Sequence, residues 1–189
     1  IEKVEKKIIK KGFSDVALLE KKAIINFHKL ICYAHSQRKE KSYNTLEKII
    51  ELNKNRAEKL NDENTYNQIN AREKYLKAWV DILFGNYEQA KNILGDLKQT
   101  QSEKKDPTAL YGYNGLMGMT KLMEGNAKEA ISFFNKGDKN NAYYNYFKGL
   151  ALKAVGEKEM AKKEFNNIIN DNFSYWELAI VKKLAKEQI

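Results

Sequence analysis

One short stretch of sequence occurs three times along the chain in slightly different forms. It reads GNYEQA at 85–90, GNAKEA at 125–130 and GEKEMA at 156–161. Each copy begins with a glycine, and apolar residues recur at helical spacing on both sides of it. Because glycine readily adopts the left-handed conformation that ends a helix, each copy predicts a tight turn between two helices.

The similarity between the three copies extends outward at fixed distances from the glycine. A small residue lies seven positions before it, an alanine five positions after it and a large apolar residue nine positions after it. These residues are Ala78, Ala90 and Leu94 in the first copy, Gly118, Ala130 and Phe134 in the second, and Gly149, Ala161 and Phe165 in the third. The small residues allow paired helices to approach closely, and the large residue fills the space between neighbouring copies. A helix pair of this size cannot bury its apolar face alone, so we expect the pairs to stack.

This pattern resembles the tetratricopeptide repeat, a helix-turn-helix unit of about 34 residues. The match is best in YFKGLAL at 146–152, which is followed by Gly156, and the recognisable resemblance covers residues 66–170. The proline that the family carries after its second helix is absent from all three copies. The resemblance implies an all-α fold: a TPR-like α-solenoid with a helical region before it and a capping helix after it.

Apolar periodicity predicts helices along the whole chain. One long helix starts at the N-cap Ser14, a second starts at Ser42, and a third runs through Tyr66 to Gly85. Leu60, at the end of the second helix, is expected to face inward. Shorter helices are expected at 87–98, 108–124, 127–136, 142–155, 157–170 and 174–188, with a mobile connection at 99–107.

The predicted helices form two parts of one continuous α-solenoid. Residues 1–65 are N-terminal helices that could hold a degenerate repeat, with Ala34 as its small residue and Lys41 in place of the turn glycine. Residues 66–189 hold the repeats and the capping helix. Within the first part, Ile1, Val4, Ile8 and Ile9 form a short amphipathic set.

Composition excludes several classes of protein. A single cysteine among 189 residues excludes an intrachain disulfide framework. No apolar run approaches the roughly 18–20 residues that cross a bilayer. The chain begins at Ile1 rather than Met, so we expect a processed or excised piece, and its compartment is not predicted.

The resemblance also implies where a partner would bind, because the first helix of each pair lines a concave groove in such arrays. The residues expected there are Arg72, Tyr75, Trp79, Met119, Tyr143, Tyr146 and Lys153. Aromatic side chains with a few basic ones suit an extended peptide or a partner helix. The sequence holds no catalytic constellation and no cofactor motif. The predicted function is therefore a non-enzymatic scaffold that binds another protein. One form of this hypothesis makes the chain a subunit of a larger assembly.

Three further features allow other interpretations. Lys and Arg number 34 against 25 Asp and Glu, a net charge of +9, which raises a nucleic-acid-associated function as the alternative. The lysines are interleaved with glutamates, however, as in a solvated helix surface. His28, Cys32 and His35 share one helical stripe and form a weak metal-site candidate. Gly112, Gly115 and Gly118 indicate either close packing of helices or close approach of a bound peptide.

Overall fold

The computed structural model describes residues 13–172 and 175–189, and every regular element within them is an α-helix. The predicted all-α fold is therefore confirmed for this part of the chain. None of the helices described there is both long and apolar enough to cross a membrane. The amphipathic set expected at residues 1–9 lies outside the described residues.

The chain divides into two compact units, residues 1–86 and 87–189. This boundary lies after the one expected from the sequence, between residues 65 and 66, so the third long helix belongs with the first two. It also falls within the first of the three sequence copies, next to its turn at Gly85. Each unit is described by itself below.

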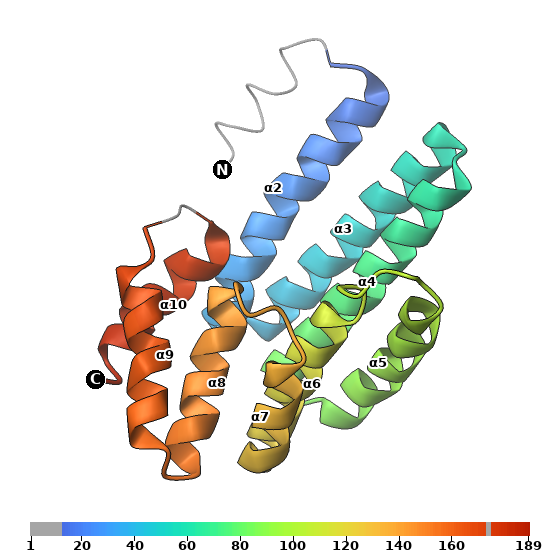
Figure 1. Ribbon diagram of the computed structural model, residues 1–189. Helices are drawn as coiled ribbons and strands as arrows, with labels where there is room; N and C mark the ends of the chain where they lie inside the picture. Colours follow the sequence, from blue (N-terminus) through green and yellow to red (C-terminus); the bar gives the residue numbers. More distant parts are fainter. Residues whose placement is uncertain (1–12, 173–174) are drawn as a thin grey trace. The chain divides into compact units, whose positions relative to one another are not determined.

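The first unit contains three long helices. They are α2 (Asp15–His35), α3 (Lys39–Leu60) and α4 (Glu63–Leu83), and Figure 1 shows them as successive antiparallel rods. α2 packs on α3, α3 packs on α4, and α2 also contacts α4. The predicted N-cap is confirmed, since the Ser14 hydroxyl oxygen accepts a hydrogen bond from the Ala17 N–H.

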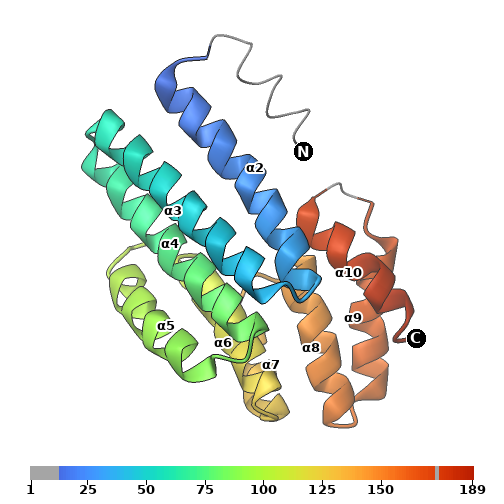
Figure 2. The same ribbon diagram turned by 180° about the vertical axis from the view of Figure 1, so that it is seen from behind.

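The second unit contains six shorter helices within the described residues. They are α5 (Tyr87–Ser102), α6 (Tyr111–Met123), α7 (Ala127–Asn135), α8 (Ala142–Ala154), α9 (Lys158–Asn170) and α10 (Trp176–Lys186). α6 packs on α7, α7 on α8 and α6 on α8; the same three contacts recur among α8, α9 and α10. The view from behind shows α10 beside α8 and α9 (Figure 2).

The three turns that the glycines predict have the same geometry. Gly85, Gly125 and Gly156 have φ angles of +80°, +85° and +88°, in the left-handed region. In each turn the backbone N–H of the residue that follows the glycine donates to a carbonyl oxygen. That oxygen belongs to the residue four positions before the glycine. The bonds join Asn86 to Asp81, Asn126 to Lys121 and Glu157 to Leu152, over 2.8–2.9 Å. These bonds use carbonyl groups that the end of a helix leaves without partners.

A fourth turn of this kind joins α2 to α3, at a residue the sequence does not mark. Gln37 has a φ of +57°, and the Arg38 N–H donates to the Tyr33 carbonyl over 2.9 Å. The expected turn at Lys41 is therefore wrong, because Lys41 lies inside α3. Counted from Gln37, Ser42 takes the alanine position and Leu46 the large apolar position, and both are buried.

The small residues serve the close packing of helices. A Cβ built on Gly118 would lie 2.6 Å from the Phe134 ring, and one built on Gly149 would lie 2.6 Å from the Phe165 ring. A Cβ on Gly115 would overlap the ring of Tyr144, which lies on α8. Gly115 and Gly118 thus make room for aromatic rings of neighbouring helices, and this favours the packing interpretation over a bound peptide at these two positions.

Several element boundaries and burial predictions need correction. Ser42 does not start a helix: α3 begins at Lys39, and the Ser42 hydroxyl donates to the Arg38 carbonyl inside it. α5 continues to Ser102, well into the expected connection. Leu60 lies at the end of α3 and is exposed, at 39%, rather than facing inward. The turn that follows a helix is short, so few residues are available to cover a side chain at the helix end.

Candidate functional site

Most of the residues predicted to line a groove belong to the core. Arg72, Tyr75 and Trp79 lie on α4 in the first unit, whereas Met119 lies on α6 and the remaining three on α8 in the second. Four of the seven are buried: Trp79, Met119, Tyr143 and Tyr146. Each of these four side chains is at most 8% exposed, so they offer a partner little surface in this structure.

Neighbouring helices of the same unit cover the two buried tyrosines of α8. The Tyr143 ring lies 5.7 Å from that of Trp176 on α10, and the Tyr146 ring lies 5.9 Å from that of Phe165 on α9. Burial accordingly raises the pKa of the Tyr146 hydroxyl. Lys153, on the same helix, is exposed and donates to the Gln188 side chain over 3.1 Å.

In the first unit the predicted groove residues contact other side chains of that unit. The Arg72 guanidinium is exposed and lies 5.4 Å from the Phe27 ring. The Trp79 ring lies 5.9 Å from the His35 ring, and neither Tyr75 nor Trp79 is without a partner in the structure. Arg72 is thus the exposed member of the predicted set on α4.

The structure does not gather a metal site around Cys32. His28 and Cys32 are exposed, and the His28 Nδ1 is 2.8 Å from the Ile24 carbonyl oxygen, where it donates. His35 is partly buried, and burial lowers its pKa. Among the described residues, no group of three His, Cys, Asp or Glu side chains is arranged to hold a metal ion.

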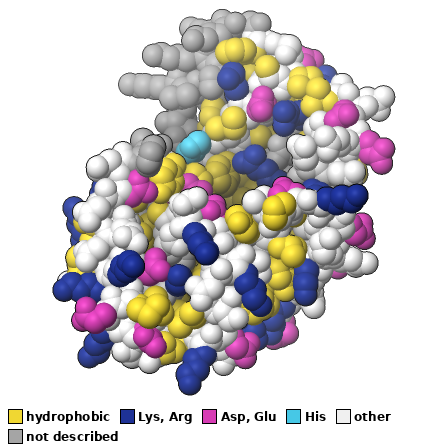
Figure 3. Space-filling view, in the orientation of Figure 1, with side chains coloured by type: hydrophobic (Ala, Val, Ile, Leu, Met, Phe, Trp, Pro, Cys, Tyr) yellow, Lys and Arg dark blue, Asp and Glu magenta, His cyan; other side chains and the backbone are white. Residues whose placement is uncertain are grey.

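The basic side chains of the second unit are mostly mixed with acidic ones. Lys121 pairs with Glu129 over 3.0 Å, Lys91 pairs with Glu124 over 2.9 Å, and Lys148 with Glu164 over 2.9 Å. Figure 3 shows Lys and Arg side chains interspersed with Asp and Glu over the visible face. This arrangement is typical of a solvated helix surface rather than a track for a polyanion.

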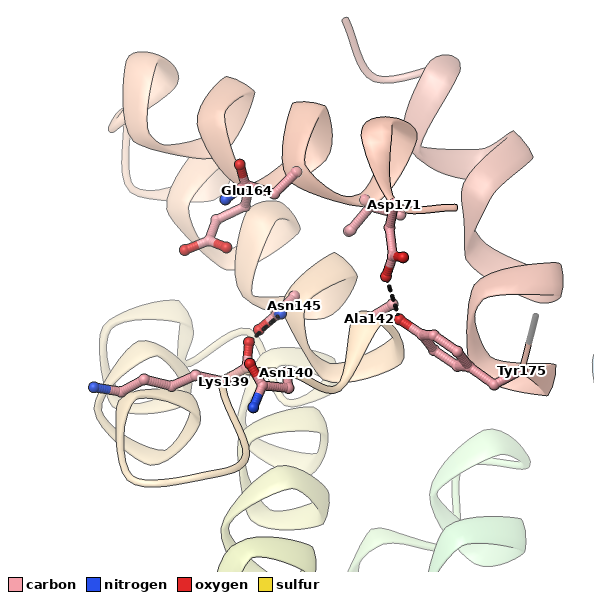
Figure 4. A pocket seen from close by; sticks show the side chains of 9 residues that line it. Lys139, Asn140, Ala142, Asn145, Glu164, Asp171 and Tyr175 are labelled. Carbon is pink, nitrogen blue, oxygen red and sulfur yellow. Dashed lines mark hydrogen bonds between the residues drawn. The ribbon is translucent and has the colours of Figure 1, made fainter. Parts of the chain in front are cut away.

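A pocket that the sequence does not mark lies between α8, α9 and the loop that precedes α8. We call it the amide pocket, and its volume is about 550 Å³. Its lining consists of Lys139, Asn140, Ala142, Asn145, Glu164, Asn167, Ile168, Asp171 and Tyr175 (Figure 4). The buried side chains of Ala142 and Ile168 are its apolar part.

Three asparagine amides give this pocket its chemistry. Asn145 Nδ2 donates to the Lys139 carbonyl over 2.7 Å, which fixes the amide and leaves its oxygen as an acceptor. The side chains of Asn140 and Asn167 form no hydrogen bond within the described parts of the chain. Asn140 and Asn167 are exposed, and each of their amides can both donate and accept a hydrogen bond, as a peptide group does.

Two further polar groups of the pocket, those of Tyr175 and Asp171, are hydrogen-bonded to each other. The Tyr175 hydroxyl donates to Asp171 Oδ2 over 2.5 Å, and Figure 4 shows this pair at one end of the pocket. Burial, the hydrogen bond to Asp171 and the charge of that carboxylate raise the pKa of the Tyr175 hydroxyl well above its ordinary value. The hydroxyl therefore stays protonated at neutral pH, and the pair acts as a fixed wall.

The comparisons with known proteins returned nothing. No protein-family model, no curated protein and no solved structure matches this chain. The local geometry therefore carries the functional argument. Sequence patterns could not locate the amide pocket, because its three amides come from a loop, α8 and α9, and their proximity depends on how α9 packs against α8.

Proposed function

We propose that the chain is a TPR-like helical-repeat scaffold that binds an extended segment of another protein. Its repeat units would be the helix pairs joined by the four equivalent turns, the pair α2–α3 included. Support comes from the recurring left-handed turn and from the small residue that faces a ring in both α6–α7 and α8–α9. Repeat arrays of this kind commonly serve as binding surfaces.

The observation that carries the proposal is the amide pocket. The side-chain amides of Asn140 and Asn167 form no hydrogen bond within the described residues, and they line the pocket together with the buried Ala142 and Ile168. An extended peptide can pair its N–H and C=O groups with the amides while a small apolar side chain contacts the buried part. In this proposal the amide pocket, rather than the predicted groove, is the binding surface, because the aromatic residues expected in that groove are mostly buried.

The test uses linear peptides selected from a displayed random library against the whole protein. Affinities of selected peptides are then measured by fluorescence anisotropy for the wild type and for the double variant Asn140→Ala, Asn167→Ala. Each lost hydrogen bond costs about 0.5–1.5 kcal/mol, so we expect the double variant to bind roughly tenfold more weakly.

The matched control is the double variant Asn166→Ala, Asn170→Ala. Both residues lie on α9 and neither lines the amide pocket, so this change should leave the affinity unaltered. If the two double variants bind equally well, or if the library yields no binding peptide, the proposed function is wrong.

A further inference from the structure

A second pocket adjoins the amide pocket and has a different charge. We call it the lysine pocket; its volume is about 510 Å³. It is lined by Asp171, Asn172, Tyr175, Leu178, Ala179, Lys182, Lys183 and Lys186. Asp171 and Tyr175 line both pockets, so the two pockets adjoin at this hydrogen-bonded pair, which is their common wall.

The lysine pocket has three lysines and one aspartate in its lining, and therefore an excess of positive charge. Lys182 donates to the Asp171 backbone carbonyl over 2.6 Å, which anchors it beside the shared wall. Lys183 and Lys186 are exposed, and neither has an acidic partner among the described side chains. Its one carboxylate, that of Asp171, already accepts the Tyr175 hydroxyl.

Two apolar residues also line the lysine pocket. Leu178 is buried and Ala179 is exposed on the same helix, one to two turns before Lys183 and Lys186. Ammonium groups without an acidic partner favour a binding partner that carries carboxylates, because complementary charges attract and orient the two surfaces. Glutamate and aspartate side chains meet this description.

We propose that the lysine pocket binds an acidic stretch of the same extended segment that occupies the amide pocket. This inference rests on the proposed function and adds the chemistry of the partner. From Glu164 to Asp171 a helix rises about 10 Å, and from Leu178 to Lys186 about 12 Å. At about 3.3 Å per residue, the partner needs roughly three residues in the amide pocket and three to four acidic ones beside α10.

The test starts from one neutral peptide that binds the amide pocket. Three glutamates, three serines or three lysines are added to it as a tail, first at one end and then at the other. Fluorescence anisotropy measures their affinities for the whole protein at low and at physiological salt. We expect the glutamate tail at one end to bind about tenfold more tightly than the serine tail at low salt. The gain should shrink as salt rises, because exposed charges are screened.

Two charge reversals of equal size separate a local effect from the net charge of the chain. Lys183→Glu with Lys186→Glu should abolish the gain from the glutamate tail. Lys162→Glu with Lys163→Glu, exposed on α9 and outside the lysine pocket, should keep it. The milder double variant Lys183→Gln with Lys186→Gln removes both charges with less risk of unfolding α10. It should also lose most of the affinity gained from the glutamate tail.

Several outcomes overturn the inference. If the neutral peptide binds but the glutamate tail adds nothing, or if both charge reversals remove the gain equally, the lysine pocket has no acidic partner while the proposed function stands. If no neutral peptide binds, both proposals are wrong. If a single-stranded oligonucleotide binds through Lys183 and Lys186 and displaces the glutamate-tailed peptide, the pocket serves a nucleic acid instead.

Discussion

At the scale of single residues, the packing of the helices depends on glycines, which have no side chain. Gly149 and Gly118 face the rings of Phe165 and Phe134 so closely that any Cβ would overlap them. Glycine inside a helix costs about 1 kcal/mol relative to alanine. The rings fill the space that each glycine leaves, and this packing offsets the cost of having glycine in α6 and α8.

We therefore expect Gly149→Ala to lower the free energy of unfolding by about 1–3 kcal/mol, the usual effect of overpacking a core. Urea denaturation followed by circular dichroism measures the change. The control is Gly95→Ala, also inside a helix of the second unit but with nothing within 4 Å of the added Cβ. That substitution should instead stabilise by about 1 kcal/mol; a stabilising Gly149→Ala would contradict the close packing.

At the scale of elements, the turns that join successive helices have a recurring geometry. Three of the four equivalent turns place glycine at the left-handed position, and the turn between α2 and α3 places Gln37 there. A residue with a Cβ pays roughly 1–2 kcal/mol in this conformation. The turn nevertheless forms, because the backbone hydrogen bonds of Gln37 and Arg38 and the packing of α2 on α3 outweigh that cost.

Gln37→Gly is accordingly expected to raise the free energy of unfolding, by about 1 kcal/mol. Chemical denaturation of wild type and variant under identical conditions gives the difference. Gln37→Ala serves as the comparison, because alanine keeps the Cβ and should give no such gain. Equal stabilisation by both substitutions would mean that Gln37 is not left-handed in solution.

At the scale of the whole molecule, the chain consists of two compact units that meet in sequence between Asn86 and Tyr87. Both pockets of the proposed site lie within the second unit. This unit has its own core, in which Leu116, Phe134 and Phe165 are buried between consecutive helices. A separate core is the usual condition for independent folding.

Residues 87–189 alone should therefore fold into a helical protein that unfolds cooperatively in urea. Trp176 is the only tryptophan in this fragment, so its fluorescence and the circular dichroism signal should change together. A shorter fragment, 127–189, lacks α6 and leaves Phe134 and Tyr144 without the glycines that face them. We expect it to lose the cooperative transition. A non-cooperative 87–189 would refute the independence of the unit.

The helices and three of their turns follow from local sequence. Apolar spacing and a well-placed glycine act over a few residues, and the pairing of Gly149 with Phe165 joins two adjacent helices. The turn at Gln37, the burial of Tyr143 and Tyr146 and the amide pocket do not follow from it. Each depends on packing between helices, and for the pocket on the meeting of a loop, α8, α9 and Tyr175. Local propensities predict that the helices form and where the glycine turns lie, whereas burial and pocket shape arise from how the side chains of different helices pack together.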